Sequence, residues 1–169
     1  MVGRGFTVIE IIITITVMGI LLILAVVNLN ATQIKARDDE RKADVEAIAS
    51  ALEIYFKTGV STTTNFGRYP NTGIGNTSAS IKAELPDVNI KSFIAPGATS
   101  TAQTFVLATN NVQTTAGVAP QPTTIQYIYQ PIMGSGALCG LGQIDCRKFN
   151  LYYRLESNNA VYQLKSKNQ

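Results

Sequence analysis

The sequence contains no histidine and no tryptophan, and only 15% of its 169 residues are charged. The absence of histidine removes both the commonest general base of enzymes and the commonest zinc ligand. The formal net charge of +3 is too small to indicate nucleic acid as the main partner. These shortages argue against an enzyme, and no cofactor is expected.

Motifs for nucleotides and metals are weak as well. Gly134, Gly136 and Gly140 form a GxGxxxG pattern that no predicted helix follows, so a flexible connection is expected there instead of a dinucleotide loop. After Asp87 the only acidic residues are Asp145 and Glu156, which are too few for a calcium cage. The sequence therefore predicts no catalytic, cofactor-binding or metal-binding residues.

The chain has two cysteines, Cys139 and Cys146. Their spacing matches neither the CxxC motif of redox proteins nor a four-ligand metal set. If this part of the chain lies outside the cytoplasm, a disulfide between the two is the expected state. Two free or metal-bound thiols are the alternative.

Apolar residues are concentrated at the N-terminus, where residues 6–27 carry a single charge, on Glu10. As a helix this stretch would be about 33 Å long, close to the ~30 Å hydrocarbon core of a bilayer. A cleaved secretory signal, a buried core helix and a plain single-pass anchor are the simplest explanations. The first fits poorly because no small-x-small cleavage site follows the run. The second fits poorly because core helices are rarely apolar on all faces.

The same segment indicates how the chain is oriented. Arg4 and the amino terminus precede the apolar run, and the bulk of the chain follows it. The positive-inside rule then keeps the short N-terminus in the cytoplasm and places residues 30–169 outside.

The helix is expected to continue beyond the apolar stretch, because residues 28–33 are polar but contain no proline or glycine. Apolar residues then recur at helical spacing, which predicts an amphipathic helix over residues 35–57; they are Val45, Ile48, Leu52 and Tyr55. Gly59 stands where a helix C-cap is expected. The sequence therefore predicts one helix of about 50 residues.

Charged residues 35–42 are predicted to form a solvated helix face, with contact to neighbouring copies as the alternative. Asp38–Lys42 and Glu53–Lys57 have the i, i+4 spacing of stabilising ion pairs. The second half of the chain has strand-like patterns and a short helix, predicted over 80–85. The predicted strands span residues 104–109, 124–132, 149–156 and 160–167, the last two forming a hairpin. We expect an α+β fold in which the amphipathic helix covers an antiparallel sheet of about three to four strands.

The start of the chain resembles a known family. Gly5-Phe6-Thr7-Val8-Ile9-Glu10, behind a short leader and ahead of an unbroken apolar helix, is similar to the class III signal of type IV pilins and pseudopilins. The loop over residues 65–70, Asn-Phe-Gly-Arg-Tyr-Pro, is similar to the one that follows the helix in many pilins. One departure is the lack of the proline that many pilins carry in the apolar segment, since the first proline here is Pro70.

The resemblance implies roles for particular residues. Residues 1–5 would be a leader removed by a prepilin peptidase after Gly5, and Phe6 would become an N-methylated terminus. Residues 6–29 would form the transmembrane and filament-core helix, 30–57 its amphipathic continuation, and 58–169 an extracytoplasmic head. The implied partners are further copies of the chain, the peptidase, an assembly platform with minor pilins, and membrane lipid before assembly.

A physical reason for Glu10 can be given beside the resemblance. A carboxylate is unfavourable in a bilayer unless it is neutralised. Cleavage after Gly5 would create an amine at Phe6, and an amine and a carboxylate in a dry filament core attract strongly. The partner amine could belong to the same chain or to a staggered neighbour. The simpler alternative is an interfacial carboxylate that reaches the lipid headgroups.

These features predict a non-enzymatic structural subunit of a type IV pilus-like filament for attachment or twitching motility. It would be held in the cytoplasmic membrane by a single span and then assembled into a surface filament. One alternative is a pseudopilin of a type II secretion or DNA-uptake machine. The other is a membrane-tethered binding or adhesive domain that does not polymerise.

Overall fold

The structure is a computed structural model that describes residues 6–59, 66–98 and 104–168. The chain divides into two compact units, Met1–Ala36 and Arg37–Gln169, and each is described by itself below. Helix α1, Val8–Thr58, has 51 residues, so the predicted single helix of about 50 residues is confirmed. Gly59 follows it with a φ of 65°, and its N–H donates to the Tyr55 carbonyl at 2.8 Å, as expected of a C-cap glycine.

The second unit contains a four-stranded sheet with the order β1-β2-β3-β4. The strands are β1 (Phe105–Leu107), β2 (Tyr127–Met133), β3 (Cys146–Arg154) and β4 (Val161–Lys165). Strands β2, β3 and β4 pair antiparallel, and the predicted hairpin of the last two strands is confirmed. Strand β1 instead pairs parallel to β2, so the sheet is mixed and the expectation of a purely antiparallel sheet is wrong for this pair.

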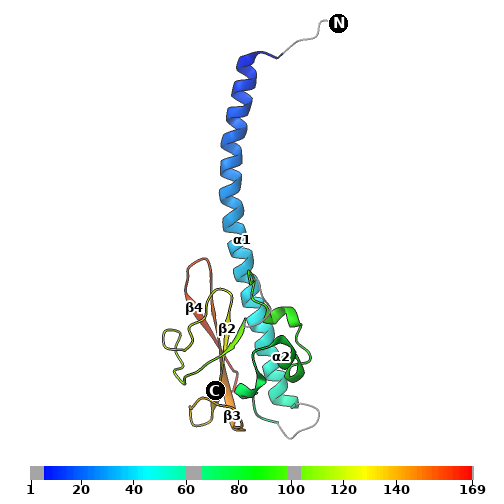
Figure 1. Cartoon of the computed structure of the whole chain (residues 1–169), viewed down its shortest axis with the longest axis vertical. Helices are drawn as coiled ribbons and strands as arrows, with labels where there is room; N and C mark the ends of the chain where they lie inside the picture. Colours follow the sequence, from blue (N-terminus) through cyan, green and yellow to red (C-terminus); the bar gives the residue numbers. More distant parts are fainter. Residues whose placement is uncertain (1–5, 60–65, 99–103, 169) are drawn as a thin grey trace. The chain divides into compact units, whose positions relative to one another are not determined.

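The core of this unit lies between the sheet and the part of α1 that belongs to it. Figure 1 shows the strands and α2 gathered around the C-terminal part of α1. The predicted apolar stripe is buried: Val45, Ile48 and Leu52 are at most 1% exposed. These side chains share one cluster with Phe149 and Leu151 of the sheet. The helix therefore covers the apolar face of the sheet, as predicted.

Three short helices connect α1 to the sheet: η1 (Thr72–Ile74), α2 (Ser78–Glu84) and η2 (Ile90–Phe93). Helix α2 begins at an N-cap, Thr77, whose hydroxyl accepts the Ser80 N–H at 3.2 Å. It ends two residues before Pro86, in agreement with the predicted short helix.

The second face of the sheet is covered by a loop. Gln130 and Tyr152 are fully buried on it, and Val118 of the loop packs in the same cluster as Tyr152. The Gln130 side chain donates to the carbonyls of Asn110 and Val112 and accepts from the Tyr152 hydroxyl at 2.9 Å. These bonds attach the loop to the sheet.

Candidate functional site

The N-terminal unit begins with a reciprocal cap. The Glu10 N–H donates to the Thr7 hydroxyl at 3.3 Å, and the Thr7 N–H lies 3.5 Å from Glu10 Oε2. This is the capping-box arrangement, in which the N-cap and the third helical residue satisfy each other's free amides. The Thr7-x-x-Glu10 spacing of this cap is visible in the sequence. The cap places the Glu10 carboxylate at the helix N-terminus, where the macrodipole favours an anion.

After the cap, the helix is mostly apolar and unburied as far as residue 24. The described side chains of residues 6–24 are all exposed within the chain, Ile23 for example by 67%. An 18-residue window of α1 has a mean hydropathy of 2.8 with none of it buried, so by length and composition α1 is a candidate membrane span. The hydroxyls of Thr14 and Thr16 donate to the carbonyls of Ile11 and Ile12 in the same helix, at 2.8 and 2.7 Å. The apolar surface thus carries few free polar groups.

Gly5 lies outside the described residues, so the structure gives no geometry for the predicted cleavage site. Phe6 is 79% exposed, and Glu10 is exposed and bonded to Thr7. Gly19 has open space around it: a Cβ built there would meet no atom within 4 Å. Nothing in the chain itself therefore requires a glycine at that position.

A charged cluster stands at the start of the second unit and was missed in the sequence. Arg41 is 2% exposed, and its guanidinium donates to Asp38 at 2.8 Å and to the carbonyl of Thr124 at 2.6 Å. It also lies 3.3 Å from Glu156 Oε2, and Arg37 makes two hydrogen bonds of 2.8 Å to the same carboxylate. We call these four side chains, Arg37, Asp38, Arg41 and Glu156, the charged cluster.

Asp38 connects the charged cluster to the turn between β3 and β4. Its carboxylate accepts the N–H groups of Glu156 and Ser157 at 2.8 and 3.0 Å. Burial acts to raise the pKa of Asp38, but hydrogen bonds from Ser157 and Glu156 and the charge of Arg41 outweigh it and lower this pKa below its ordinary value. Hydrogen bonding to Arg37 likewise lowers the pKa of Glu156. Both carboxylates therefore stay ionised at neutral pH. The charged cluster attaches the part of α1 around residues 37–41 to the turn after β3.

The cluster corrects the expected ion pairs. Asp38 pairs with Arg41 instead of Lys42, and Lys42 lies 3.4 Å from Asp39. Glu53 is buried, and its carboxylate accepts the Tyr69 hydroxyl at 3.1 Å and the Lys167 N–H at 2.8 Å. The predicted solvated face of residues 35–42 is therefore interrupted by two buried residues, Asp38 and Arg41, which pair with each other at i, i+3 and also bond to distant segments.

Residues 66–70, the described part of the loop predicted over 65–70, are anchored by Tyr69. Its ring lies between Phe56 and Phe149, with ring centroids 4.7 and 4.8 Å away. Burial, together with the negative charge of Glu53, raises the pKa of Tyr69 to about 12, so the hydroxyl remains a donor. Tyr69 N–H also donates to the Cys146 carbonyl at 2.8 Å, which links this loop to the second cysteine.

Cys139 and Cys146 form a disulfide with a Cα–Cα distance of 5.6 Å, and both side chains are buried. The Thr72 N–H donates to the Cys139 carbonyl at 3.1 Å, and Asn71 donates to the Gln143 carbonyl at 2.7 Å. These bonds hold the disulfide loop against η1. The disulfide agrees with the expectation for a head outside the cytoplasm.

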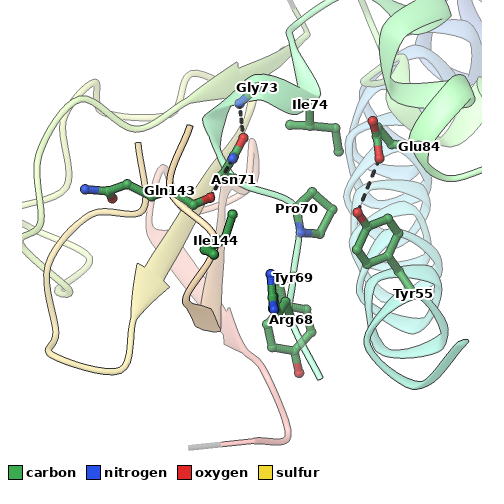
Figure 2. A pocket seen from close by; sticks show the side chains of 10 residues that line it. All are labelled: Tyr55, Arg68, Tyr69, Pro70, Asn71, Gly73, Ile74, Glu84, Gln143 and Ile144. Carbon is green, nitrogen blue, oxygen red and sulfur yellow. Dashed lines mark hydrogen bonds between the residues drawn. The ribbon is translucent and has the colours of Figure 1, made fainter. Parts of the chain in front are cut away.

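A polar pocket of about 200 Å³ lies between the disulfide loop and α1. Figure 2 shows Tyr55 and Glu84 on one side of it, joined by a 3.4 Å hydrogen bond, and Asn71 bonded to Gln143 on the other. Among the residues that the structure describes, no group of three potential metal ligands occurs, here or elsewhere.

The structure therefore combines a long helix with an apolar first part and a second unit whose sheet is covered by the remainder of that helix. A disulfide lies in the C-terminal part of the sequence. One comparison with known proteins bears on this combination. The chain is 36% identical over 83 residues to the type II secretion system core protein G of Klebsiella michiganensis. The match includes 49% of this chain and 54% of that protein, so the chain spans about half the length of the curated relative. No protein-family model matches the chain, and no solved structure matches it.

Proposed function

We propose that the chain is a structural subunit of a pilin-like filament and polymerises through its apolar N-terminal helix. One observation carries the proposal: the first part of α1 is apolar on all sides, unburied within the chain, and bears one carboxylate in its first turn. A helix of this kind needs either lipid or copies of itself around it. The Gly5-Phe6 junction and Glu10 stand where the pilin signal has its cleavage site and its acidic residue.

Glu10 has a defined task in this proposal. Its carboxylate is held at the helix N-terminus by Thr7 before processing. Removal of residues 1–5 would leave an amine at Phe6, next to the cap. In a packed helix bundle, that amine or the one of a neighbouring copy would neutralise the carboxylate, and each charge would offset the desolvation of the other.

Of the two filament roles, the similarity favours a secretion-system filament over a surface pilus, because the relative is named as a core protein of a type II secretion system. Before assembly the chain would lie in the cytoplasmic membrane with its head outside. Deletion of the gene should then reduce the amount of secreted proteins in the medium. Loss of surface filaments and twitching with normal secretion would favour the pilus role instead.

Intact-mass measurement on the purified full-length protein tests the proposal most directly. We expect the mass to lack residues 1–5 and to include one added methyl group. Gly5→Val should block this processing and abolish filaments. A mature protein that retains Met1–Gly5 would contradict the pilin-like assignment and favour a plain membrane-tethered domain.

A second test addresses Glu10 itself. Glu10→Val should be processed normally but yield at least tenfold fewer filaments, since the charge partner of the new amine is lost. Ile12→Val is a matched control that changes the same helix without removing charge, and it should assemble normally. Normal filament yield for Glu10→Val would show that the carboxylate is not required for assembly.

A further inference from the structure

The sheet has two edge strands, β1, which is only three residues long, and the longer β4. The Ser166 N–H donates to the Phe149 carbonyl, and the Leu155 N–H donates to the Ala160 carbonyl. In an antiparallel pair, alternate residues of one strand hydrogen-bond to the other strand. These two bonds show that the residues of β4 that bond to β3 are Tyr162 and Leu164. The backbone groups of the other residues of the strand, Val161, Gln163 and Lys165, therefore point away from the sheet. Among the described residues, no hydrogen bond to these groups is present.

A groove runs beside this edge. It has a volume of about 350 Å³ and lies between α1 and β4. Ala49 and Ser50 line it from α1, and Leu164 lines it from β4. Leu164 faces the core under α1, so the groove is where the side chains of one more strand would lie.

The two ends of the groove differ in charge. At one end is Glu46, which is exposed and makes no ion pair or hydrogen bond to any residue that the structure describes. Tyr162 is near this end, because its ring is stacked on Tyr153, whose pKa is raised by burial and also by the charge of Glu46. At the other end are Lys167 and Glu53, whereas the side chain of Lys165 lies on the opposite face of the sheet because it follows Leu164 in the strand. The carboxylate of Glu53, which accepts from Tyr69 and from the Lys167 N–H, keeps its negative charge and offsets the positive charge of Lys167.

We infer that the β4 edge and this groove bind an extended segment of another polypeptide, which adds to the sheet as a fifth strand antiparallel to β4. An exposed strand edge recognises backbone amides and carbonyls, and the pockets beside it select alternate side chains. Antiparallel addition starts the segment at the lysine end and finishes it at Glu46. The fitting segment therefore has a small apolar residue beside Leu164 and, two positions later, a basic residue that faces Glu46.

A second copy of the chain fits this edge less well than such a segment. Two β4 edges paired antiparallel would be related by a two-fold axis, and the two copies of α1 over the sheets would run in opposite directions. The side chains that each β4 places on the groove face are Tyr162 and Leu164, so a second copy would bring no basic side chain to Glu46. This inference does not depend on polymerisation and goes beyond the proposed function.

The test uses full-length protein in dodecyl maltoside micelles and two fluorescein-labelled peptides. One is Gly-Glu-Thr-Val-Thr-Lys-Gly, and the other, Gly-Lys-Thr-Val-Thr-Glu-Gly, has the same composition with the charges exchanged. Fluorescence anisotropy should show at least tenfold tighter binding of the first peptide. Glu46→Gln should reduce that preference. Equal binding of both peptides, or binding of neither, would overturn the inference.

A pair of variants at one position separates the backbone from the side chain. Gln163→Pro removes an outward N–H that makes no bond to β3, so the strand should be retained while addition of a further strand is blocked. Gln163→Ala removes the same side chain but keeps the N–H. We expect peptide binding to be lost in Gln163→Pro and kept in Gln163→Ala. Equal binding by the two variants would contradict strand addition.

Two further measurements cover the remaining outcomes. In the wild-type protein, the first peptide should slow hydrogen exchange of the amides of Val161, Gln163 and Lys165, a result that does not depend on how the proline variant folds. Unchanged exchange would overturn the inference. Sedimentation of the protein without peptide tests for a second copy: wild-type dimers that become monomers in Gln163→Pro would show that the edge pairs with itself and would also overturn it.

Discussion

The two parts of α1 differ in where their side chains find partners. In the N-terminal unit the side chains of residues 6–24 are exposed, and the hydroxyls of Thr14 and Thr16 bond to carbonyls of their own helix. In the second unit Arg41 and Glu53 are buried and bond to residues far away in the sequence. One continuous helix thus has a first segment whose apolar side chains are exposed within the chain and a second segment whose side chains are buried by its own domain.

The largest difference is expected at Arg41. Arg41→Ala leaves Asp38 buried without its ion-pair partner, and such a change typically costs about 3–5 kcal/mol. All seven tyrosines lie in residues 37–169, so thermal unfolding followed by tyrosine circular dichroism in detergent reports on the head. Lys42→Ala removes an exposed pair and should change the stability by less than about 0.5 kcal/mol. Similar losses for both variants would contradict the importance of the charged cluster.

Two leucines, one in each segment of α1, test whether only the second segment stabilises the head. Leu52 is fully buried under the sheet, whereas Leu22 is 66% exposed in the N-terminal unit. Leu52→Ala should destabilise the head by about 2–5 kcal/mol, because it opens a cavity in the core. Leu22→Ala should leave the same unfolding transition unchanged. A shift of that transition by Leu22→Ala would show that the first segment also stabilises the head.

The smallest expected effect is a pH dependence at Asp44. Burial, with a contribution from Glu40, raises the pKa of Asp44 to about 6, although hydrogen bonds from Tyr127 and Ser92 oppose the shift. The folded state then binds this proton more tightly than the unfolded state, so stability falls as the pH rises from about 4 through 6. Because Asp44 is only half-buried, the effect should be about 1 kcal/mol or less.

Asp44→Asn keeps a hydrogen-bond acceptor for Tyr127 and removes the charge. The variant should unfold at a higher temperature than the wild type at pH 8, and this difference should vanish near pH 4. Asp39→Asn, an exposed carboxylate on the same helix, is the control and should show no such trend. A constant difference between pH 4 and 8 would contradict the raised pKa.

Several elements could be predicted because their signal is local. The stripe of Val45, Ile48 and Leu52 repeats at helical spacing, and it is the buried face of α1. The last two strands were predicted as a hairpin because their alternation and the turn between them lie within one short segment. The boundary of the compact unit, between Ala36 and Arg37, has no local marker, since the helix continues through it.

The charged cluster and the covered second face of the sheet could not be predicted in the same way. Arg41 depends on Thr124 and Glu156, and Gln130 depends on Asn110, Val112 and Tyr152, which approach only in the folded chain. The parallel pairing of β1 has the same origin, because β1 is only three residues long and its partner lies beyond a long loop.

The sequence by itself determined the long helix, its apolar first part with Glu10, the α+β class and the antiparallel hairpin. Hydrophobic periodicity and turn residues act over neighbouring positions, so they can be read without coordinates. The tertiary structure alone decided which charges on α1 are buried, how the loop over residues 108–121 covers the sheet, and that β4 is an open edge. A buried charge or an unpaired amide is defined by groups from distant segments, and no local pattern records their approach.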